Sequence, residues 1–490
     1  MPPSWSYLFA LLIVGTSAIA SADSGRRISI ELTTLRLMHE KGLITDAEMD
    51  SALRDLSDSV GDRALESTSL AIGKWSTTIY GVVQSDNVYD TTESFNDFAG
   101  NALVQRPGTY AGEHGRFTMS LRNSRLGFRL RAPEYHHVRV SALLEMDFLG
   151  NQAALGYNQA YQISEGAYFS SPVFRMRHYM MKLETPIVDI LIGQYWDLFG
   201  WQSQYHPNTV EIQGVVGQIY ARTPQIRISK TIRTRPLTLE MAVAMVRPPQ
   251  RDSSTPEGQG AVRLSLNKLK GKQTLGAVGS VESPLSIAFS GDVRHFSLPE
   301  FTAKPVNSVD KTGWAVGVDA FVPVIPLQLL HRFGNLGLNG EYVWGYGIAD
   351  LYTGLNNGVA NPALPNPMML NPAPTYTINA DPSMVLFAAD GTAHLIQIQS
   401  YMVGLQYYLP RLDGRVWVAA NYMNIRSNNA KLHPNGMFAR LSEDRADVNL
   451  FGDVTPAVRI GLSYAYYLDH YSDGVSAPNH RVQFSAFYLF

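Results

Sequence analysis

Arginine recurs at alternating positions in several stretches of this chain, and that spacing has a chemical use. Of the 40 basic residues, 30 are arginine, whose planar guanidinium group grips carboxylate or phosphate oxygens in pairs. Arg125, Arg129 and Arg131 alternate with apolar residues, so on a β-strand these three arginines share one face. Arg175 and Arg177 repeat the pattern further along the chain. Neighbouring rows of this kind would attract anionic solutes into a water-filled pore.

Two carboxylates lie close to these arginines on a neighbouring alternating segment. The candidate pore-lining residues are Arg116, Arg122, Arg125, Arg129, Arg131, Arg139, Arg175, Arg177, Glu145 and Asp147. One interpretation is that the arginines meet a passing solute, and the other is that they pair with Glu145 and Asp147 to keep the wall rigid. An arginine row that faces an acid row also creates a field across the pore, so part of the set could serve each purpose.

Residue patterns for other chemistry are missing from the sequence. The absence of cysteine excludes thiolate metal sites and cysteine nucleophiles, and the zinc-peptidase, serine-hydrolase and phosphate-loop motifs do not occur. His136 and His137 would point to opposite faces of a strand, so a turn after Pro133 is favoured over a metal site. A net charge of -2 gives no support for nucleic-acid binding. We predict a non-enzyme without catalytic residues, metal or cofactor.

The elements that must position the arginines are β-strands. Only 17% of residues are charged, 11% are aromatic and 40 are glycine, which favours many short strands joined by tight turns. In the last segment Val482, Phe484, Tyr488 and Phe490 share one face, while polar residues occupy much of the other. The chain lacks an apolar run long enough for a spanning helix, so it could cross a membrane only as a closed barrel.

Segments with strand character recur along the chain. Besides residues 138–148 and the last segment, they are 77–88, 117–121, 126–130, 173–183, 190–196, 225–232, 237–246, 261–266, 285–289, 314–322, 336–344, 400–408, 415–421 and 457–466. Single-chain barrels usually have an even strand number. The predicted fold is therefore all-β: a transmembrane antiparallel β-barrel of about 16 strands, preceded by a short N-terminal helical or coiled-coil segment.

The predicted chain organisation has three parts. Residues 1–22 contain a short apolar core followed by small residues, which is typical of a signal peptide. Residues 23–70 show heptad-like apolar spacing and predict a periplasmic helical segment, either self-associating or a simple spacer. Residues 71–490 form the barrel, and within them 346–399, rich in Asn, Pro and Gly, predict a long extracellular or constriction loop.

Several motifs of the first half resemble those of DcaP-like outer-membrane porins and, more loosely, the phosphate-selective porin O and P group. The motifs cover residues 80–83 with Asp86 and Asp90, 124–128, 144–150, 175–178, 193–199, 207–209 and 222–227. The resemblance implies a homotrimer of 16-stranded barrels with an N-terminal periplasmic coiled coil, located in the bacterial outer membrane. It also implies dicarboxylate-like solutes.

The predicted function is a porin, a passive diffusion channel for small hydrophilic and anionic solutes, with selectivity set by lumen arginines. The expected partners are outer-membrane lipid and lipopolysaccharide, the small anionic solutes, and the barrel-assembly machinery through the C-terminal Phe490. A surface adhesin or receptor barrel without transport is one alternative, and an outer-membrane barrel hydrolase is another.

Overall fold

The computed structural model describes most of the barrel region. The described residues are 69–72, 75–97, 99, 103–150, 172–211, 215–251, 253–302, 304–327, 334–352, 383–388, 392–410, 414–432 and 439–490. The predicted signal segment 1–22, nearly all of the predicted helical segment 23–70 and the middle of the predicted loop 346–399 lie outside them. Those three predictions therefore remain predictions.

The described chain is almost entirely strand. The strands are β1 (Ser69–Ile72), β2 (Trp75–Asp90), β3 (Arg116–Ser120), β4 (Arg125–Arg131), β5 (Arg139–Asp147), β6 (Arg175–Glu184), β7 (Asp189–Trp196), β8 (Arg222–Arg233), β9 (Leu237–Val246), β10 (Glu257–Leu275), β11 (Gly279–Pro299), β12 (Ser308–Ile325), β13 (Leu336–Tyr346), β14 (Val385–Phe387), β15 (Ala393–Leu395), β16 (Gln397–Tyr408), β17 (Val416–Arg426), β18 (Arg440–Thr455), β19 (Val458–Tyr471) and β20 (Ser476–Leu489). One short helix, α3 (Tyr110–Glu113), and the 3-10 turns η1 (Phe199–Trp201), η2 (Ala349–Leu351) and η4 (Ala430–Leu432) lie in the connections.

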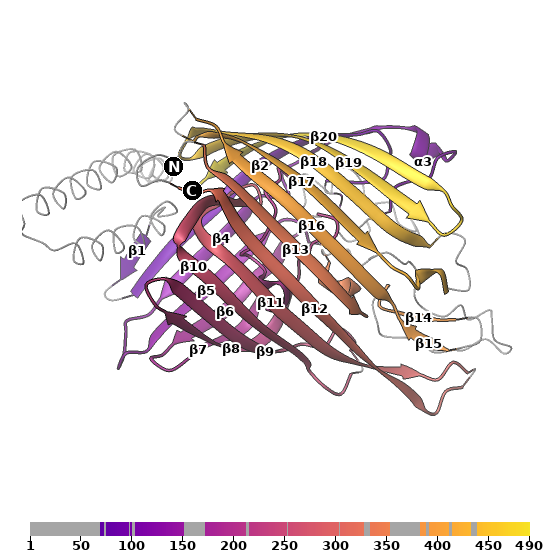
Figure 1. Ribbon diagram of the computed structural model, residues 1–490, viewed down its shortest axis with the longest axis horizontal. Coiled ribbons are helices and arrows are strands. Elements are labelled where there is room, and N and C mark those ends of the chain that lie inside the picture. The colour runs from indigo at the N-terminus through magenta and orange to yellow at the C-terminus, as the bar shows by residue number, and fades with distance from the viewer. Residues whose placement is uncertain are drawn as a thin grey trace, which may run out of the picture.

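The main sheet is antiparallel and closes on itself (Figure 1). Its 18 segments reduce to 16 wall strands, because β3 and β4 pair in succession with β2 and form one broken strand, and β1 pairs only with the start of β2. The seam joins β2 to β20, with Val83 opposite Tyr488. The predicted 16-stranded antiparallel barrel is confirmed. β14 and β15 form a separate hairpin.

Alternation of side chains along each strand separates an apolar outer face from a polar lumen. On β20, Val482, Phe484 and Tyr488 point outward and are 45%, 44% and 53% exposed, whereas Arg481 and Gln483 point inward and are 1% and 2% exposed. This confirms the faces predicted for these residues of the last segment. Among the described residues, helices of the length and hydropathy that a bilayer crossing requires were not found.

The structure corrects the strand prediction at two places. Residues 117–121 and 126–130, predicted as separate strands, are β3 and β4 of a single wall strand, interrupted where Arg122 and Asn123 turn inward and become buried. β18 was not predicted, because Glu443, Asp444, Arg445 and Asp447 hide its short apolar alternation.

The two ends of the barrel differ in their connections (Figure 1). Short turns and the C-terminal Phe490 lie at one end, which we call the short-turn end; one of these turns contains His136 and His137, both with positive φ. The predicted turn is thus confirmed. The long connections lie at the other end, which we call the loop end.

The described residues between β7 and β8, 197–211 and 215–221, do not stay at the loop end but fold into the lumen; we call them the constriction loop. The backbone N–H of Leu198 donates to Gln259 on β10, and that of Ile219 donates to Glu341 on β13. Val210 donates to Asn449 on β18. The loop therefore crosses the lumen to the opposite wall.

The tip of the β10–β11 hairpin, residues 270–280, enters the lumen from the short-turn end. A register shift in β10 precedes the tip, and Ala277 within it is fully buried. The backbone N–H of Thr274 donates to Gln406 over 2.8 Å, and the Asn208 amide of the constriction loop donates to the Gly276 carbonyl over 2.6 Å. The loop and the hairpin tip thus meet inside the barrel.

Candidate channel constriction

Arg177 is the centre of a charged cluster on the inner wall formed by β4, β5 and β6. Its Nε donates to Glu145 over 2.5 Å and its Nη1 donates to Asp147 over 3.0 Å. Arg175 also binds Asp147, with Nη2 at 2.6 Å. Arg125 lies directly opposite Asp147 in the β4–β5 register. The predicted arginines and acids of these three strands therefore meet on one wall.

A bulge in β6 shapes this cluster. The β5–β6 register shifts between Glu145 and Met146, so that Arg177 is the extra residue and His178 stands opposite Glu145. Arg177 and His178 are consequently both buried on the lumen side, 1% and 3% exposed. Strict alternation would have turned His178 outward, which is why it was not among the predicted residues.

Arg222, the first residue of β8, adds a further guanidinium to the cluster. Its Cζ lies 4.9 Å from the ring centre of Trp196 and 5.1 Å from that of Tyr220. Within the described part of the chain, Arg222 Nη1 and Arg125 Nε are buried without a hydrogen-bond partner. Because an unsatisfied buried donor is costly, these groups are available to a ligand that brings acceptor oxygens.

The constriction loop lines the cluster with His206 and Tyr220. Burial, together with the nearby arginines, lowers the pKa of His206 to about 3, so the imidazole is neutral at physiological pH. Burial alone would raise the pKa of Tyr220, but Arg177, Arg222 and Arg125 outweigh it and bring the pKa down to about 7. The lowered pKa of Tyr220 indicates a positive electrostatic potential at the site.

The opposite part of the wall is acidic. Arg294 on β11 binds Asp292 at 2.8 Å, Glu257 at 2.9 Å and Asp350 at 2.5 Å, three carboxylates for one guanidinium. Burial raises the pKa of Asp350, in the connection after β13, to about 6, although Arg294 acts in the opposite direction. The described lumen wall thus carries an arginine cluster on β4, β5 and β6 and an acid-rich cluster on β10 and β11.

The remaining predicted arginines are distributed between the two ends of the barrel. Arg129 lies over the Tyr80 ring at 4.4 Å, next to the cluster. Arg122 is buried beside the β3–β4 break and binds Asp97 at 3.0 Å. Arg116 binds the Phe95 carbonyl. Arg122 and Arg116 therefore lie outside the cluster and bind the connection between β2 and β3, the first long connection.

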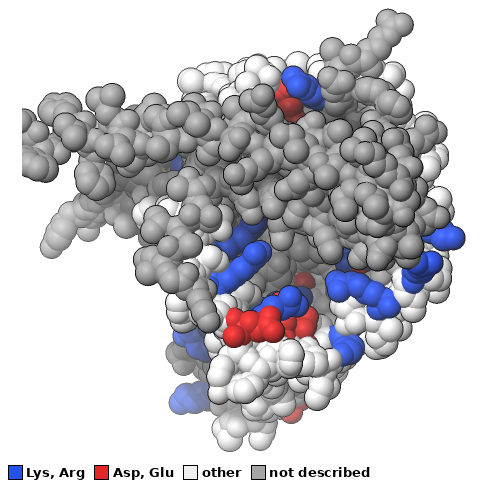
Figure 2. Space-filling model, turned by 90° about the vertical axis from the view of Figure 1, so that its left-hand side faces the viewer, with Lys and Arg blue, Asp and Glu red and all other residues white. Residues whose placement is uncertain are grey.

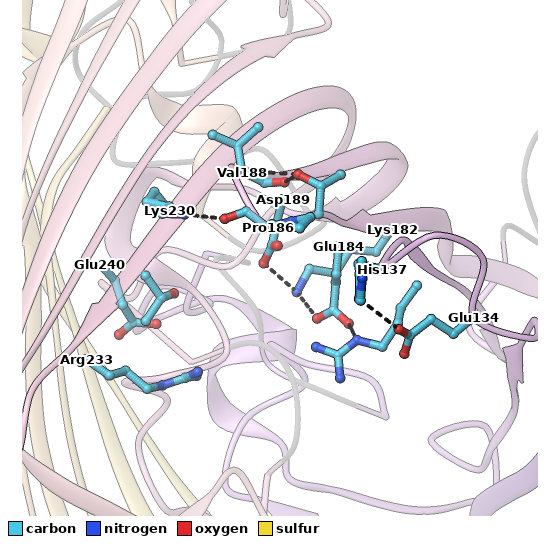
Figure 3. A pocket seen from close by; sticks show the side chains of 13 residues that line it. Glu134, His137, Lys182, Glu184, Pro186, Val188, Asp189, Lys230, Arg233 and Glu240 are labelled. Carbon is cyan, nitrogen blue, oxygen red and sulfur yellow. Dashed lines mark hydrogen bonds and ion pairs between the residues drawn. The ribbon is translucent and has the colours of Figure 1, made fainter.

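At the short-turn end, basic side chains surround a hollow that also contains acids (Figure 2). A cavity of about 570 Å³ lies there between the turns after β4, β6 and β8 (Figure 3). The predicted Arg139 lines it and lies 3.4 Å from Glu184, and the predicted Arg131 is exposed nearby at the end of β4. Lys182 binds both Glu184 and Asp189. Charges here largely pair with one another.

No family model matches the chain, and no curated protein matches it. Its structure does resemble solved structures. The outer membrane channel DcaP of Acinetobacter baumannii is 17% identical, with a TM-score of 0.61 over 86% of this chain and 100% of that chain. The barrel has the DcaP fold.

Two other solved structures are similar over much of the chain, with lower TM-scores. OmpF of Salmonella typhi, in complex with daunomycin, is 10% identical, with a TM-score of 0.47 over 86% of this chain and 100% of that chain. OprB of Pseudomonas putida is 11% identical, with a TM-score of 0.43 over 84% and 94%. The resemblance to DcaP-like porins predicted from the motifs is confirmed for the fold, which agrees with the predicted location in the bacterial outer membrane.

The sequence did not single out the residues that the constriction loop brings to the cluster. Trp196, His206, Tyr220 and Arg222 come from a connection and its flanking strand ends, where alternation gives no face. A signal for some of them was present, since 193–199 and 222–227 are among the motifs shared with DcaP-like porins. That these residues line the arginine cluster is seen only in the structure, which places them inside the lumen.

Proposed function

We propose that this protein is a passive porin of the outer membrane that prefers small anionic solutes, such as dicarboxylates. One observation carries the preference: Arg125 Nε and Arg222 Nη1 are buried donors without a partner among the described residues, next to Arg177. A carboxylate passing this point would satisfy donors that the protein leaves open. Glu145 and Asp147 already hold Arg175 and Arg177, so those two arginines stiffen the wall.

The proposal includes the surroundings of the barrel. Its apolar outer face would contact membrane lipid and lipopolysaccharide, and the short-turn end would face the periplasm. The resemblance to DcaP-like porins supports a homotrimer. The C-terminal Phe490, whose N–H and C=O both pair with Gly81 across the seam, would be recognised by the barrel-assembly machinery. Diffusion through such a channel requires no catalytic group or cofactor.

The test is single-channel current of the refolded protein in a planar bilayer under a salt gradient. We expect stable steps and a reversal potential that indicates anion preference. Replacing Arg125 and Arg222 together with glutamine should lower the anion-to-cation permeability ratio by about threefold or more, since two uncompensated charges are lost at the narrow part of the lumen.

Arg247, in the connection after β9, provides a matched control for charge. It lies outside the cluster, so Arg247→Gln should leave the ratio unchanged. Cation preference in the unmodified protein would contradict the anion proposal. A folded barrel without conductance would contradict the channel itself and favour a surface receptor.

A further inference from the structure

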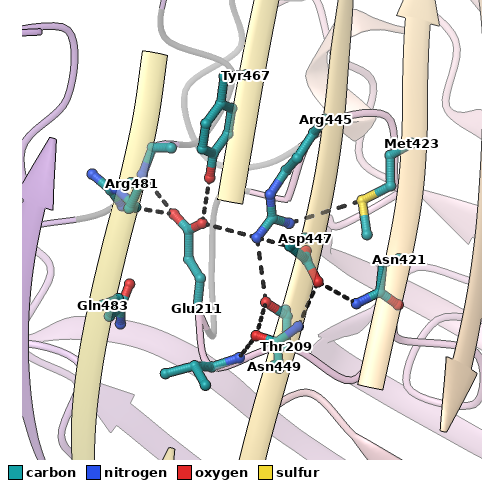
Figure 4. A network of polar contacts seen from close by, with 12 residues as sticks. Thr209, Glu211, Asn421, Met423, Arg445, Asp447, Asn449, Tyr467, Arg481 and Gln483 are labelled. Atoms are coloured by element: carbon teal, nitrogen blue, oxygen red, sulfur yellow. Dashed lines mark hydrogen bonds and ion pairs between the residues drawn. The ribbon is translucent and has the colours of Figure 1, made fainter. Parts of the chain in front are cut away.

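Glu211 of the constriction loop lies against the inner wall formed by β18, β19 and β20, between Arg445 and Arg481 (Figure 4). Its carboxylate is 3% exposed. One oxygen accepts from Arg445 at 3.2 Å and from the Tyr467 hydroxyl at 2.6 Å. The other accepts from Arg481 at 3.1 Å and from the backbone N–H of Ala99 at 2.7 Å. One side chain thus ties the loop to β18, β19, β20 and the first long connection.

The neighbours of Glu211 reinforce this attachment without replacing it. Thr209 and the backbone N–H of Val210 donate to Asn449 of β18 at 3.3 and 3.0 Å. These two are neutral hydrogen bonds, and Arg445 adds one bond to the Thr209 hydroxyl at 3.3 Å. Glu211 instead pairs its carboxylate with two guanidinium groups, and such charge-assisted bonds are about twice as strong as neutral ones. Removing the charge of Glu211 therefore removes the strongest contacts of this part of the loop.

Glu211 also determines the charge that this wall presents. Arg481 has Asp90 as a second partner at 2.9 Å, and Arg445 has Asp447 at 3.0 Å. With Glu211 the five groups carry two positive and three negative charges, a balance of -1. Without it, two arginines face two acids and the balance is zero. The loop therefore brings in the acid that keeps this wall from attracting anions.

We propose that Glu211 is the positioning residue that fixes the constriction loop across the lumen and keeps the β18–β20 wall from adding to the anion attraction of Arg125 and Arg222. This inference rests on the proposed channel function and adds a determinant of pore size and selectivity to it. The two roles of Glu211, attachment and charge, lead to separable effects.

The experiment compares Glu211→Gln with the unmodified protein in planar bilayers. Conductance should rise by about twofold, with frequent current fluctuations as the loop leaves the wall, and the anion-to-cation permeability ratio should also rise, because the lumen loses a negative charge. Glu184→Gln is the matched control: Glu184 is an acid at the short-turn end that binds Lys182 and Arg139, away from the constriction loop, so conductance should stay constant.

A disulfide staple separates attachment from charge. The chain has no cysteine, and Thr209→Cys with Asn449→Cys would join the loop to β18 where the two native side chains are 3.3 Å apart. In the Glu211→Gln background, the oxidised staple should return conductance to the unmodified value while the permeability ratio stays raised, and reduction should restore the higher conductance.

Two results would overturn the inference: unchanged conductance in Glu211→Gln, or a staple that forms but leaves conductance high. Lack of anion preference in the unmodified protein would instead count against the proposed solute class. Even then, a conductance increase in Glu211→Gln that the staple reverses would support the positioning role, so the two failures are distinguishable.

Discussion

At the residue scale, the lumen cluster depends on how tightly its members pack. Tyr80 on β2 lies across Gly127 on β4, and its hydroxyl donates to Glu145 on β5 over 2.8 Å. A Cβ at Gly127 would overlap the Tyr80 ring. The glycine therefore makes room for an aromatic bridge between three strands, and that bridge orients the carboxylate that holds Arg177.

We expect Gly127→Ala to destabilise the barrel by about 1–3 kcal/mol, because the ring must move out of a filled space. Urea unfolding in detergent followed by tryptophan fluorescence would measure the change. Gly260→Ala is the control, since a Cβ there meets open space. Equal stability of both variants would show that the Tyr80 ring shifts without cost.

A pH dependence follows from the same cluster. The pKa of Tyr220 lies near 7, below its usual value of 10, so raising the pH from 6 to 8 removes its proton and adds a negative charge beside the arginines. Anion preference should therefore fall over this range, measured as a shift in reversal potential at fixed salt gradient. In Tyr220→Phe the fall in anion preference should be clearly smaller, with only the contribution of carboxylates such as Asp350, whose pKa is about 6, remaining; a fall as large as in the unmodified protein would assign the titration to groups other than Tyr220.

The site could be predicted from sequence only in part, because alternation gives the face of a residue but not its partners. Period-2 alternation assigns a face to each strand residue, so it placed Arg125, Arg177, Glu145 and Asp147 in one set. Alternation could not predict which guanidinium groups pair with a carboxylate, because the β6 bulge determines which arginines reach Glu145 and Asp147. Arg222 joins the set only through the fold of the constriction loop.

At the element scale, the lumen is narrowed by two insertions of different kinds. The constriction loop comes from the loop end and the β10–β11 hairpin tip from the short-turn end. Sequence predicted the β10 and β11 cores, 261–266 and 285–289, but both strands run much further. The extensions toward the hairpin tip, 267–275 and 279–284, are mostly polar and show no clear alternation, because the tip packs on side chains of other strands. The extension of β11 toward the loop end does alternate in burial, but Asp292 and Arg294 on its inner face conceal the strand.

Gln406 of β16 is the main anchor of the hairpin tip. Its amide accepts from Thr274 N–H and donates to the Thr274 carbonyl, at 2.8 and 3.1 Å. A single cysteine replacing the buried Ala277 should react slowly with a water-soluble thiol reagent. Adding Gln406→Ala should speed that reaction about tenfold, corresponding to roughly 1.4 kcal/mol of lost anchoring. An unchanged rate would mean that the tip is held mainly elsewhere.

At the scale of the whole molecule, the fold class was readable because lipid permits so few alternatives. Apolar outer faces such as that of Val482, Phe484 and Tyr488 repeat around the barrel, and strands that cross lipid can pair all their edge hydrogen-bonding groups only by closing. β18 escaped prediction because its large outward apolar residues, Val448, Leu450 and Val454, lie toward one end of the strand amid inward charges, and lumen-facing strand positions tolerate any polar residue.

Closure of the barrel also gives Phe490 a structural role, because its backbone pairs with Gly81 across the seam. We expect deletion of Phe490 to lower the amount of heat-resistant folded barrel in outer-membrane fractions by several-fold, because both backbone pairs with Gly81 are lost. Phe490→Tyr keeps the aromatic ring and those pairs and should assemble normally. Semi-native gel electrophoresis of membrane fractions distinguishes the two, and full assembly of the deletion variant would show that β20 closes the seam without its end.

The β2–β20 seam joins residues that the ribosome makes far apart: Asp86 accepts a hydrogen bond from Ser485, 399 positions later. Pairings so distant in sequence are slow to form. Until the final strand has left the translocation pore, both edges of the sheet remain unpaired and exposed to other chains. The newly made polypeptide therefore has to be kept apart from its neighbours for the whole of its transit, and its folding is completed by its end rather than its beginning.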